Sequence, residues 1–390
     1  MEMNSKKIYN YAPDVDAETL RQFKECYSRD FVTKAALMPD AHVGYAAPIG
    51  SVLITKNYVV PAWVGFDIGC GMIAIQIKGK NILEKIRANK DKIHKIINET
   101  VPMGVGEYNR EKDITKKTSE EFQKLLKKFE LKPHDKDIFQ YLKTAALKHL
   151  GTLGGGNHFI EIGYDTMKKS ENKDEIWLII HSGSRGIGYR VAKKYMISAS
   201  GSKTDYEKTF PLDVKSALGK EYLNILDFSM EYALMNRLEM SYKIIAVLED
   251  VLGGKLKTKL WANKNHNHAI FERGNFIHRK GATPAKKGEK GIIPGNMRDG
   301  SYLIEGKGNA EFLSSSSHGA GRALSRNLAR KQITLRQFHE AMKGIKANID
   351  ERIIDEAPMA YKNIDNVMAS QKASVKIIKK IKPVMNWKGK

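Results

Sequence analysis

The segment Val64-Gly65-Phe66-Asp67-Ile68-Gly69-Cys70-Gly71-Met72 sets a carboxylate and a lone thiol in a glycine-rich turn after an apolar run. Cys70 has no CxxC partner, because the second cysteine, Cys26, lies in a charged segment far away. A zinc knuckle built from thiolates is therefore excluded. Asp67 and Cys70 are three residues apart and can converge on one ion, although a buried inert cysteine beside a turn-capping aspartate is the commoner reason for such a pair.

Four later glycine-rich or polar segments each carry histidine. They are Gly155-Gly156-Asn157-His158, His181-Ser182-Gly183-Ser184-Arg185, Asn265-His266-Asn267-His268 and Ser317-His318-Gly319-Ala320-Gly321. Such segments lie where loops project side chains from a rigid scaffold. A thiol, a nearby carboxylate and several loop histidines together indicate a catalytic metal centre assembled from distant parts of the chain.

The first two histidine segments each leave an alternative open. Gly154–Gly156 would let the backbone approach a ligand before His158, yet a glycine-rich hairpin with an incidental histidine fits equally well. His181 precedes Ser182–Gly186, which has the composition of a phosphate cradle. A buried, hydrogen-bonded histidine is a somewhat better explanation for His181 taken alone.

The later histidines differ in their expected roles. His266 and His268 would share one face of a strand, so the sequence does not rank them as ligands. Ser314–Arg322 runs into an expected helix, whose free N–H groups would favour a bound phosphate, and this makes His318 a candidate metal ligand or nucleophile toward phosphorus. Four histidines on charged helical stretches are expected at the solvated surface: His94, His134, His149 and His339.

The composition is that of a protein without a membrane span. The chain has 390 residues, of which 42% are hydrophobic, enough for one large core or two domains. It contains no run of 18 or more apolar residues and no apolar segment after the N-terminal lysines. Two cysteines in this length fit a reducing compartment. We expect a cytoplasmic protein that does not enter a membrane.

The formal net charge of +22 has two explanations. Clustered lysine and arginine gain affinity for a polyanion by releasing its counterions, which favours a nucleic-acid partner. Lysine is also abundant on ordinary amphipathic stretches here, such as residues 85–90, as in a lysine-rich proteome. From charge alone the two explanations weigh about equally.

The order of hydrophobic patterns predicts an α+β protein with one domain over residues 1–390. Apolar runs bounded by glycine and proline predict strands first, at 47–55 and 72–78. Helical periodicity then fills residues 82–150, which we interpret as a helical insertion that could act as a lid. Strands are expected again at 158–162 and 176–180, and short ones between 269 and 308. Long helices are expected at 222–251 and 323–344.

The common nucleotide-binding motifs are missing. There is no GxxxxGK[ST] loop and no K-x-D-G lysine motif, the closest string being Met297-Arg298-Asp299-Gly300. An enzyme that uses a nucleotide would need a different nucleophile.

Taken together, the motifs resemble the RtcB family of RNA-splicing ligases. The strings that carry the resemblance are Met38–Gly44, Val64–Met72, Gly154–Glu161, His181–Gly186, His266-Asn267, Pro294–Ser301, His318–Arg322 and Asp355–Lys362. They occur in order from about residue 38 onward, and their joint presence is very specific. The resemblance implies a distinctive fold in which mixed and antiparallel sheets surround a central metal site.

The resemblance also implies a chemistry. Similar proteins join RNA that ends in a 2′,3′-cyclic phosphate or 3′-phosphate to RNA with a 5′-hydroxyl, in tRNA splicing or RNA repair. They use GTP and two Mn²⁺ ions, through a histidine–GMP intermediate and an RNA–ppG end. RNA is then the expected partner of the basic surface, and an archease-type protein is a candidate activator. We expect a monomer.

The implied site residues follow by matching motifs. His318 would be the nucleophile that takes GMP. The manganese ligands would be Asp67, Cys70, His158, His181 and His266, with Cys70 bridging two ions. The guanylate contacts would be Asn157, His158, Glu161, His266, Asn267, Pro294, Gly295, Asn296, Met297, Ser301, His318, Gly319, Ala320, Gly321 and Lys388. Asn296 stands where members commonly have serine, and Lys388-Gly389 is followed by an extra Lys390.

Two other classes stay open on the residues alone. A metal-dependent phosphohydrolase or nuclease acting on RNA would use similar glycine-rich His/Asp loops but no covalent guanylate. An RNA-binding protein without catalysis would explain the charge but not the histidine and cysteine segments.

Overall fold

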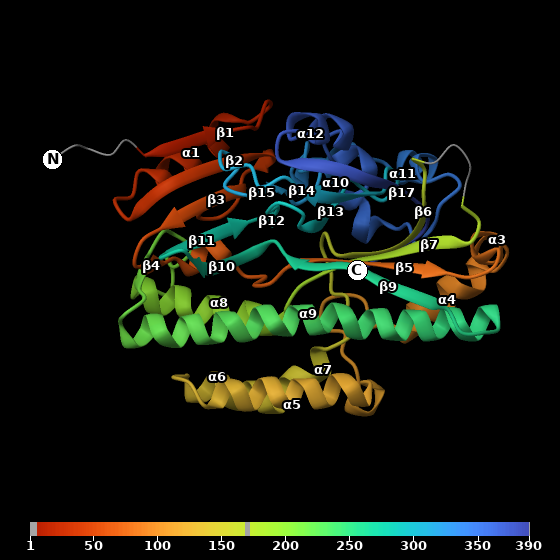
Figure 1. Cartoon of the computed structure of the whole chain (residues 1–390), viewed down its shortest axis with the longest axis horizontal. Helices are drawn as coiled ribbons and strands as arrows, with labels where there is room; N and C mark the ends of the chain where they lie inside the picture. The colour runs from red at the N-terminus through yellow and green to blue at the C-terminus, as the bar shows by residue number, and fades with distance from the viewer. Residues whose placement is uncertain (1–5, 168–171, 390) are drawn as a thin grey trace.

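Helices and strands are mixed along the computed structural model, which describes residues 6–167 and 172–389. The α+β class predicted from the sequence is confirmed. Figure 1 shows two sheets lying side by side above one long helix, with a layer of shorter helices beneath that helix.

The first sheet has five strands in the order β1-β2-β3-β11-β10. Its strands are β1 (Lys7–Asn10), β2 (Val32–His42), β3 (Ile49–Thr55), β10 (Asn267–Glu272) and β11 (Asn275–Lys280). Only β1 and β2 pair in parallel. Helix α1 (Ala17–Tyr27) packs against β2, and its Phe23 and Cys26 are buried in the core that it shares with that sheet.

The second sheet runs β13-β14-β17-β6-β7-β5-β9, with β16 added beside β17. Its strands are β5 (Gly71–Lys78), β6 (Phe159–Asp165), β7 (Glu175–Ser182), β9 (Lys257–Asn265), β13 (Lys290–Pro294), β14 (Ser301–Gly306), β16 (Lys346–Ala347) and β17 (Val375–Lys388). Every residue of β7 is buried, as its continuous apolar run Ile176–Ile180 predicts for a strand covered on both faces. Two short ladders complete the strands: β4 (Tyr58–Val59) with β8 (Leu212–Asp213), and β12 (Ala282–Pro284) with β15 (Ser315–Ser317).

Helix α9 (Ala217–Leu252) runs for 36 residues beneath both sheets (Figure 1). Ser216 begins it by accepting a hydrogen bond from the backbone N–H of Gly219. Gly253 ends it in the left-handed conformation, with φ of 72°, which glycine adopts without steric cost. The helix contacts β5, β7 and β9, so it forms the floor beneath the strands that carry the candidate ligands.

Residues 82–150 are helical as expected. They form α3 (Ile82–Ala88), α4 (Lys90–Thr100), a 3-10 turn (Glu111–Asp113), α5 (Lys116–Glu130), α6 (Lys136–Tyr141), a π-helical turn (Leu142–Ala146) and α7 (Leu147–His149). Ile86 and Ile93 pack into the core of the second sheet, whereas Phe122 and Phe129 pack into the core beneath α9. The segment is thus built into both cores, and its interpretation as an insertion stays a prediction.

Two expectations about the helices were wrong. The single helix expected at 323–344 is two helices, α10 (Arg326–Gln332) and α11 (Leu335–Ala341). Thr334 and Gln337 form a capping box that begins α11 and so divides the segment. His94 is not at the surface: it is 3% exposed and stacks on Trp387 with ring centroids 4.7 Å apart.

The remaining helical elements are α2 (Pro61–Val64), α8 (Arg185–Ser200), α12 (Ile364–Ser370) and 3-10 turns at Glu351–Glu356 and Pro358–Ala360. Over residues 6–167 and 172–389, none of the helices combines the length and the apolar character that crossing a membrane requires.

Candidate metal centre and nucleotide cavity

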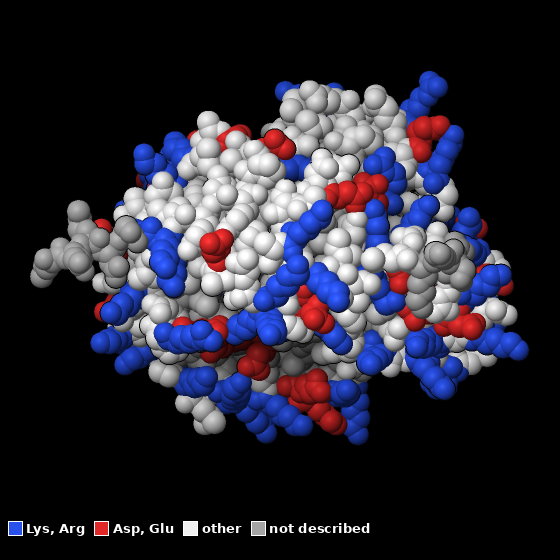
Figure 2. Space-filling model, turned by 45° about the horizontal axis from the view of Figure 1, so that its top comes forward, with Lys and Arg blue, Asp and Glu red and all other residues white. Residues whose placement is uncertain are grey.

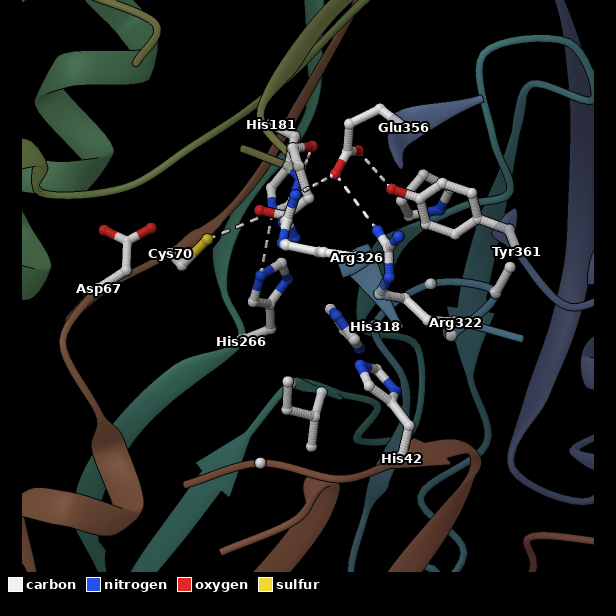
Figure 3. A pocket seen from close by; sticks show the side chains of 18 of the residues that line it. His42, Asp67, Cys70, His181, His266, His318, Arg322, Arg326, Glu356 and Tyr361 are labelled. Atoms are coloured by element: carbon white, nitrogen blue, oxygen red, sulfur yellow. Dashed lines mark hydrogen bonds and ion pairs between the residues drawn. The ribbon is translucent and has the colours of Figure 1, made fainter. Parts of the chain in front are cut away.

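A cavity of 980 Å³ opens where the two sheets meet. Most of the residues singled out from the sequence line it: Asp67, Cys70, Asn157, His181, His266, Asn267, Pro294, Gly295, Asn296, Met297, His318, Gly319, Ala320, Gly321 and Lys388. Figure 3 shows the thiol and imidazole groups on one side of this cavity and a cluster of arginine, tyrosine and glutamate on the other. His158, Glu161 and Ser301 are buried and do not line it.

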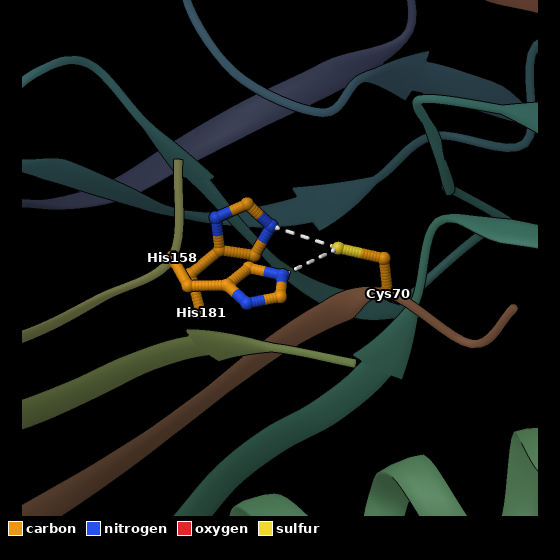
Figure 4. A group of neighbouring side chains, drawn as sticks. All are labelled: Cys70, His158 and His181. Atoms are coloured by element: carbon orange, nitrogen blue, oxygen red, sulfur yellow. Dashed lines mark hydrogen bonds between the residues drawn. The ribbon is translucent and has the colours of Figure 1, made fainter. Parts of the chain in front are cut away.

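Cys70, His158 and His181 form a buried cluster with metal-ligand geometry (Figure 4). The Cys70 Sγ lies 3.5 Å from His158 Nε2 and 3.2 Å from His181 Nε2. Each imidazole uses its other nitrogen on a main-chain carbonyl: His158 Nδ1 on Leu153 at 3.0 Å, and His181 Nδ1 on Asn157 at 3.2 Å. Such contacts fix the ring so that Nε2 presents its lone pair to the cluster.

Asp67 and His266 extend this cluster on two sides. Asp67 Oδ2 is 2.9 Å from His158 Nε2, and His266 Nε2 is 3.2 Å from His181 Nε2. All five side chains proposed as manganese ligands therefore form one connected group. His268 does not join it, because its Nε2 lies 3.1 Å from Nη1 of the buried Arg279. The structure thus separates two histidines that the sequence could not rank.

Adjacent strands explain why these ligands meet. Strands β6, β7, β5 and β9 are neighbours in the sheet, and His158, His181, Cys70 and His266 lie at or just beyond their ends at one edge. The cross-strand partners Met72 and His181, and Gly71 and Asn265, set this register. A side chain at position 71 would come within 2.0 Å of the Lys264 carbonyl oxygen, so only glycine allows β9 this close to the thiol.

The electrostatics of the cluster suit a divalent cation. Burial lowers the pKa of His181 and His266 well below its usual value, so both imidazoles are neutral. Burial tends to raise the pKa of Asp67, but the hydrogen bond and charge of His158 outweigh it and hold that pKa well below its ordinary range. Burial and the nearby Asp67 raise the pKa of Cys70, so its thiolate needs a cation beside it.

A buried arginine supports the backbone behind these candidate ligands, and no motif pointed to it. Arg237 of α9 donates through Nη1 to the carbonyls of Gly69 at 3.0 Å and Ser182 at 2.7 Å. Its Nη2 donates to Asn265 Oδ1 at 2.6 Å, and its Nε to Asn263 Oδ1 at 2.7 Å. One guanidinium therefore fixes the residues next to Cys70, His181 and His266.

His318 lines the cavity beside His266, at the edge of the candidate metal cluster (Figure 3). Its ring centroid is 4.9 Å from that of His266. Its Nδ1 lies 2.7 Å from Asp40 Oδ2, which also accepts the backbone N–H groups of His318 and Gly319 at 3.1 Å each. With Nδ1 donating to the carboxylate, Nε2 keeps its lone pair, and it has no hydrogen-bond partner among the described residues.

The helix expected directly after His318 was wrong. His318 follows the short strand β15, and the next helix, α10, begins only at Arg326. The N–H groups of His318 and Gly319 are therefore held by Asp40 and are not a helix terminus open to a phosphate. Asp40 belongs to the string Met38–Gly44, whose role the sequence left unassigned.

Comparisons with known proteins assign the chain to a family. A family model described as tRNA-splicing ligase RtcB matches residues 22–389. The chain belongs to the RtcB family. It is 33% identical to the RNA-splicing ligase RtcB of Escherichia coli strain K12, over 98% of this chain and 97% of that protein. It is also 30% identical to the tRNA-splicing ligase RtcB of Nanoarchaeum equitans, over 92% and 88% of the two chains. The family inferred from the motifs is confirmed.

The far wall of this RtcB cavity is a buried ion-pair network centred on Glu356. Lys388, at the end of β17, contacts Glu356 Oε2 at 2.5 Å, and Arg326 Nη1 contacts its Oε1 at 2.7 Å. Arg322 and the Tyr361 hydroxyl also bond this carboxylate. Burial tends to raise the pKa of Glu356, but Lys388 and Arg326 hold it below its usual value, so the carboxylate stays ionised.

Next to this network, three buried polar atoms lack a hydrogen bond of good geometry within the described part of the chain, although the Ser301 side chain lies close enough to lower the pKa of Glu161 against the effect of burial. They are Glu161 Oε1, Ser301 Oγ and Asn386 Oδ1. Glu161 and Asn386 face each other across strands β6 and β17, and Asn386 lines the cavity. Burial raises the pKa of Glu161 to about 8. Unpaired buried polar atoms are rare in proteins, so this cluster is suited to a ligand that carries both donors and acceptors.

Other residues of the RtcB motifs are used inside the protein. The Asn296 side chain accepts from the N–H groups of Arg298 and Asp299, and its Nδ2 donates to Asp299 Oδ2 at 2.7 Å, so it closes its own turn. Ser182 donates its hydroxyl to Leu153 O at 2.8 Å, and Ser184 to Ile68 O at 2.5 Å. The phosphate cradle considered for the Ser182 segment therefore has no free hydroxyl.

Proposed function

We propose that the protein is a GTP- and Mn²⁺-dependent RNA ligase that joins RNA 2′,3′-cyclic phosphate or 3′-phosphate ends to 5′-hydroxyl ends. One observation carries the proposal: His318 presents an unpaired Nε2 to the same cavity as a Cys70/His158/His181 cluster. A hydrolase would need the metal cluster but no such nucleophile. Family membership supports RNA ligation, because the similar proteins are named RNA-splicing or tRNA-splicing ligases.

Two Mn²⁺ ions would be held by Asp67, Cys70, His158, His181 and His266, with the Cys70 thiolate shared between them. The mixed carboxylate, thiolate and imidazole set suits a borderline divalent ion. When bound, the ions would neutralise triphosphate charge and stabilise charge that develops on phosphorus.

In the first step, His318 Nε2 attacks the α-phosphorus of GTP, a P–N bond forms, and pyrophosphate leaves. Asp40 keeps the proton on Nδ1 and stabilises the positive charge that the ring gains. An oxygen of the RNA 3′-phosphate then attacks the guanylate phosphorus and releases His318, which gives RNA–ppG. The 5′-hydroxyl finally attacks the RNA phosphorus, and GMP leaves as the phosphodiester forms.

The guanine would lie against the unpaired cluster of Glu161, Ser301 and Asn386, with Lys388 near its rim. Protonated Glu161 can donate a hydrogen bond to a purine edge, and ionised Glu161 can accept one. Because the group is buried, a base that does not match it would leave polar atoms unpaired, which makes the contact selective. Two segments would border the guanylate, as the motifs imply: Gly319–Gly321 and Pro294–Met297.

The experiment is incubation with α-³²P-GTP and Mn²⁺, followed by denaturing gel electrophoresis. We expect an acid-labile label on the wild-type protein and none on His318→Ala. Ligation of a 3′-phosphate RNA to a 5′-hydroxyl RNA should require GTP. Release of phosphate or shorter RNA without any guanylated protein would instead identify a two-metal phosphohydrolase or nuclease.

A further inference from the structure

Three aromatic rings in mutual contact line the cavity; Tyr45 and Tyr189 are exposed, and Phe66 between them is partly buried. Tyr45 and Phe66 contact edge to face with centroids 5.6 Å apart, and Phe66 and Tyr189 stack at 5.2 Å with an interplanar angle of 28°. Tyr45 is 67% exposed and Tyr189 is 52% exposed. Two large aromatic side chains exposed next to each other mark a binding surface more often than isolated ones do. We call Tyr45, Phe66 and Tyr189 the aromatic row.

The row is held rigidly although two of its rings are exposed. Tyr45 lies in the loop between β2 and β3, where the Gln22 side chain accepts from Gly44 N at 3.1 Å and donates to Gly44 O at 3.0 Å. Tyr189 projects from the first half of helix α8, and Phe66 lies in the turn after α2. Three separate elements thus fix the rings, and a ligand that stacks on them pays little to order them.

The row continues directly into the reaction site. All three rings line the same 980 Å³ cavity as Cys70 and His318, and Phe66 immediately precedes the proposed manganese ligand Asp67. A molecule that lies on the row therefore leads toward the metal cluster. None of the metal, guanylate or nucleophile roles above uses these rings.

The chemistry around the row favours a nucleic acid as its occupant. Arg190, next to Tyr189, is exposed and lies over the Tyr141 ring at 4.1 Å, so cation and aromatic surface continue along α8. The chain carries a net charge of +22, and Figure 2 shows lysine and arginine along the lower edge, the right side and the centre of the face in view, with acidic residues among them. Exposed aromatic rings beside positive charge bind unpaired bases by stacking. A protein partner would instead call for a closed apolar patch with few charges at its core.

We propose that Tyr45, Phe66 and Tyr189 form a stacking platform for the unpaired terminal bases of the RNA strand that enters the cavity. This proposal rests on the proposed function for the identity of the strand. The platform recognises the faces of bases, not their edges, so it accepts any sequence and requires the end to be single-stranded. It holds the terminal phosphate or hydroxyl at the metal cluster while the sugar–phosphate backbone stays in solvent.

The test measures RNA binding by fluorescence anisotropy with two single-stranded oligonucleotides, one ending in a 3′-phosphate and one beginning with a 5′-hydroxyl. Each is used intact and with its two terminal bases removed as abasic sites. Because stacking on one ring changes affinity by roughly 5- to 150-fold, we expect the abasic strand to bind at least about fivefold more weakly. The arm that shows the loss identifies which end occupies the platform.

Variants assign the effect to the row. Tyr45→Ala and Tyr189→Ala should each weaken binding of the intact strand and reduce the difference between intact and abasic strands. Tyr45→Phe and Tyr189→Phe keep the rings and should bind like the wild type. Phe271→Ala is the matched control, because Phe271 is 66% exposed but does not line the cavity. Melting temperatures establish that each variant is folded.

Two results would overturn the platform: equal affinity of the wild type for intact and abasic strands of both kinds, or an undiminished difference in both alanine variants. Either would indicate that the row serves another occupant, such as a protein. Failure of the proposed function is a separate result, since it appears as absence of the GTP-derived label on the wild-type protein whatever the RNA affinities are.

Discussion

Replacing Asp40 with asparagine isolates the charge behind His318. Asp40 is 0% exposed. Its Oδ2 accepts hydrogen bonds from His318 Nδ1 at 2.7 Å and from the backbone N–H groups of His318 and Gly319 at 3.1 Å each. Asparagine has the same shape, so its Oδ1 can accept from the same three donors. Its amide would occupy the place of Asp40 Oδ1, near the buried Ser317 hydroxyl, whose oxygen can accept a hydrogen bond from it. The substitution thus removes the negative charge while keeping the geometry.

The expected loss follows from the strength of one contact. A hydrogen bond to a charged group contributes about 1.5–3 kcal/mol, against about 0.5–1.5 kcal/mol for a neutral one. The difference of about 1–2 kcal/mol applies to the transition state, in which the ring becomes positive. It corresponds to guanylation about 5- to 30-fold slower. Asp40→Ala differs, because it leaves two backbone N–H groups unpaired and should also cost about 2–6 kcal/mol of folding free energy.

The assay is single-turnover formation of the labelled protein from α-³²P-GTP at saturating GTP and Mn²⁺. Metal content and the free energy of unfolding are measured on the same preparations. We expect slower labelling of Asp40→Asn, with wild-type metal content and nearly wild-type stability. A wild-type labelling rate would refute the role of the charge. A slower rate with loss of metal would refute the argument that Asp40 acts only through His318.

Three further predictions test the rest of the site. Cys70→Ser should remove tightly bound metal, as measured by elemental analysis. The control His268→Gln changes a histidine outside the cluster and should leave the metal content unchanged. Equal metal content in the two variants would contradict the proposed centre. Glu161 is protonated in the folded protein up to about pH 8 but ionises near its ordinary pKa when unfolded, so stability should fall as pH rises between these values. Glu161→Gln should flatten this decline in urea unfolding at pH 5 and pH 8, and parallel declines would refute the burial of an ionisable group there. Arg237→Met leaves two main-chain carbonyls and two asparagine side chains without their donor, so the free energy of unfolding should fall by about 3–5 kcal/mol. A fall of less than about 1 kcal/mol would show that the guanidinium is dispensable.

The sequence predicted most strands and helices because their hydrophobic patterns are local. Ile176–Ile180 and the isoleucine face of residues 82–97 are examples in which burial matches periodicity. The helix expected at 323–344 failed because periodicity does not reveal that Thr334 and Gln337 cap a second helix. His94 failed because a charged neighbourhood along the chain says nothing of Trp387, which approaches from 293 residues away.

For the candidate site, too, the sequence predicted some residues and missed those whose partners lie far along the chain. Motifs singled out the cysteine, aspartate and histidine side chains that gather at the cavity, since such groups are rare and lie in glycine-rich segments. Their supports were not visible: Asp40 stood in a quoted motif without a role, and Arg237 lay in an ordinary helical stretch. Both act through contacts with residues far along the chain. The packing of β15 on β2 brings His318 to Asp40, and the register of β5, β7 and β9 brings the partners of Arg237 together.

The place of β17 has a consequence for the synthesis of the protein. This strand is translated after every other described strand, yet it lies in the interior of its sheet, between β14 and β6. Until the ribosome releases it, the sheet exists as two halves with open hydrogen-bonding edges, and Lys388 is missing from the cavity. A nascent chain that stalls early therefore exposes edges that chaperones and proteases can recognise, and it cannot display a complete reaction cavity to cellular RNA.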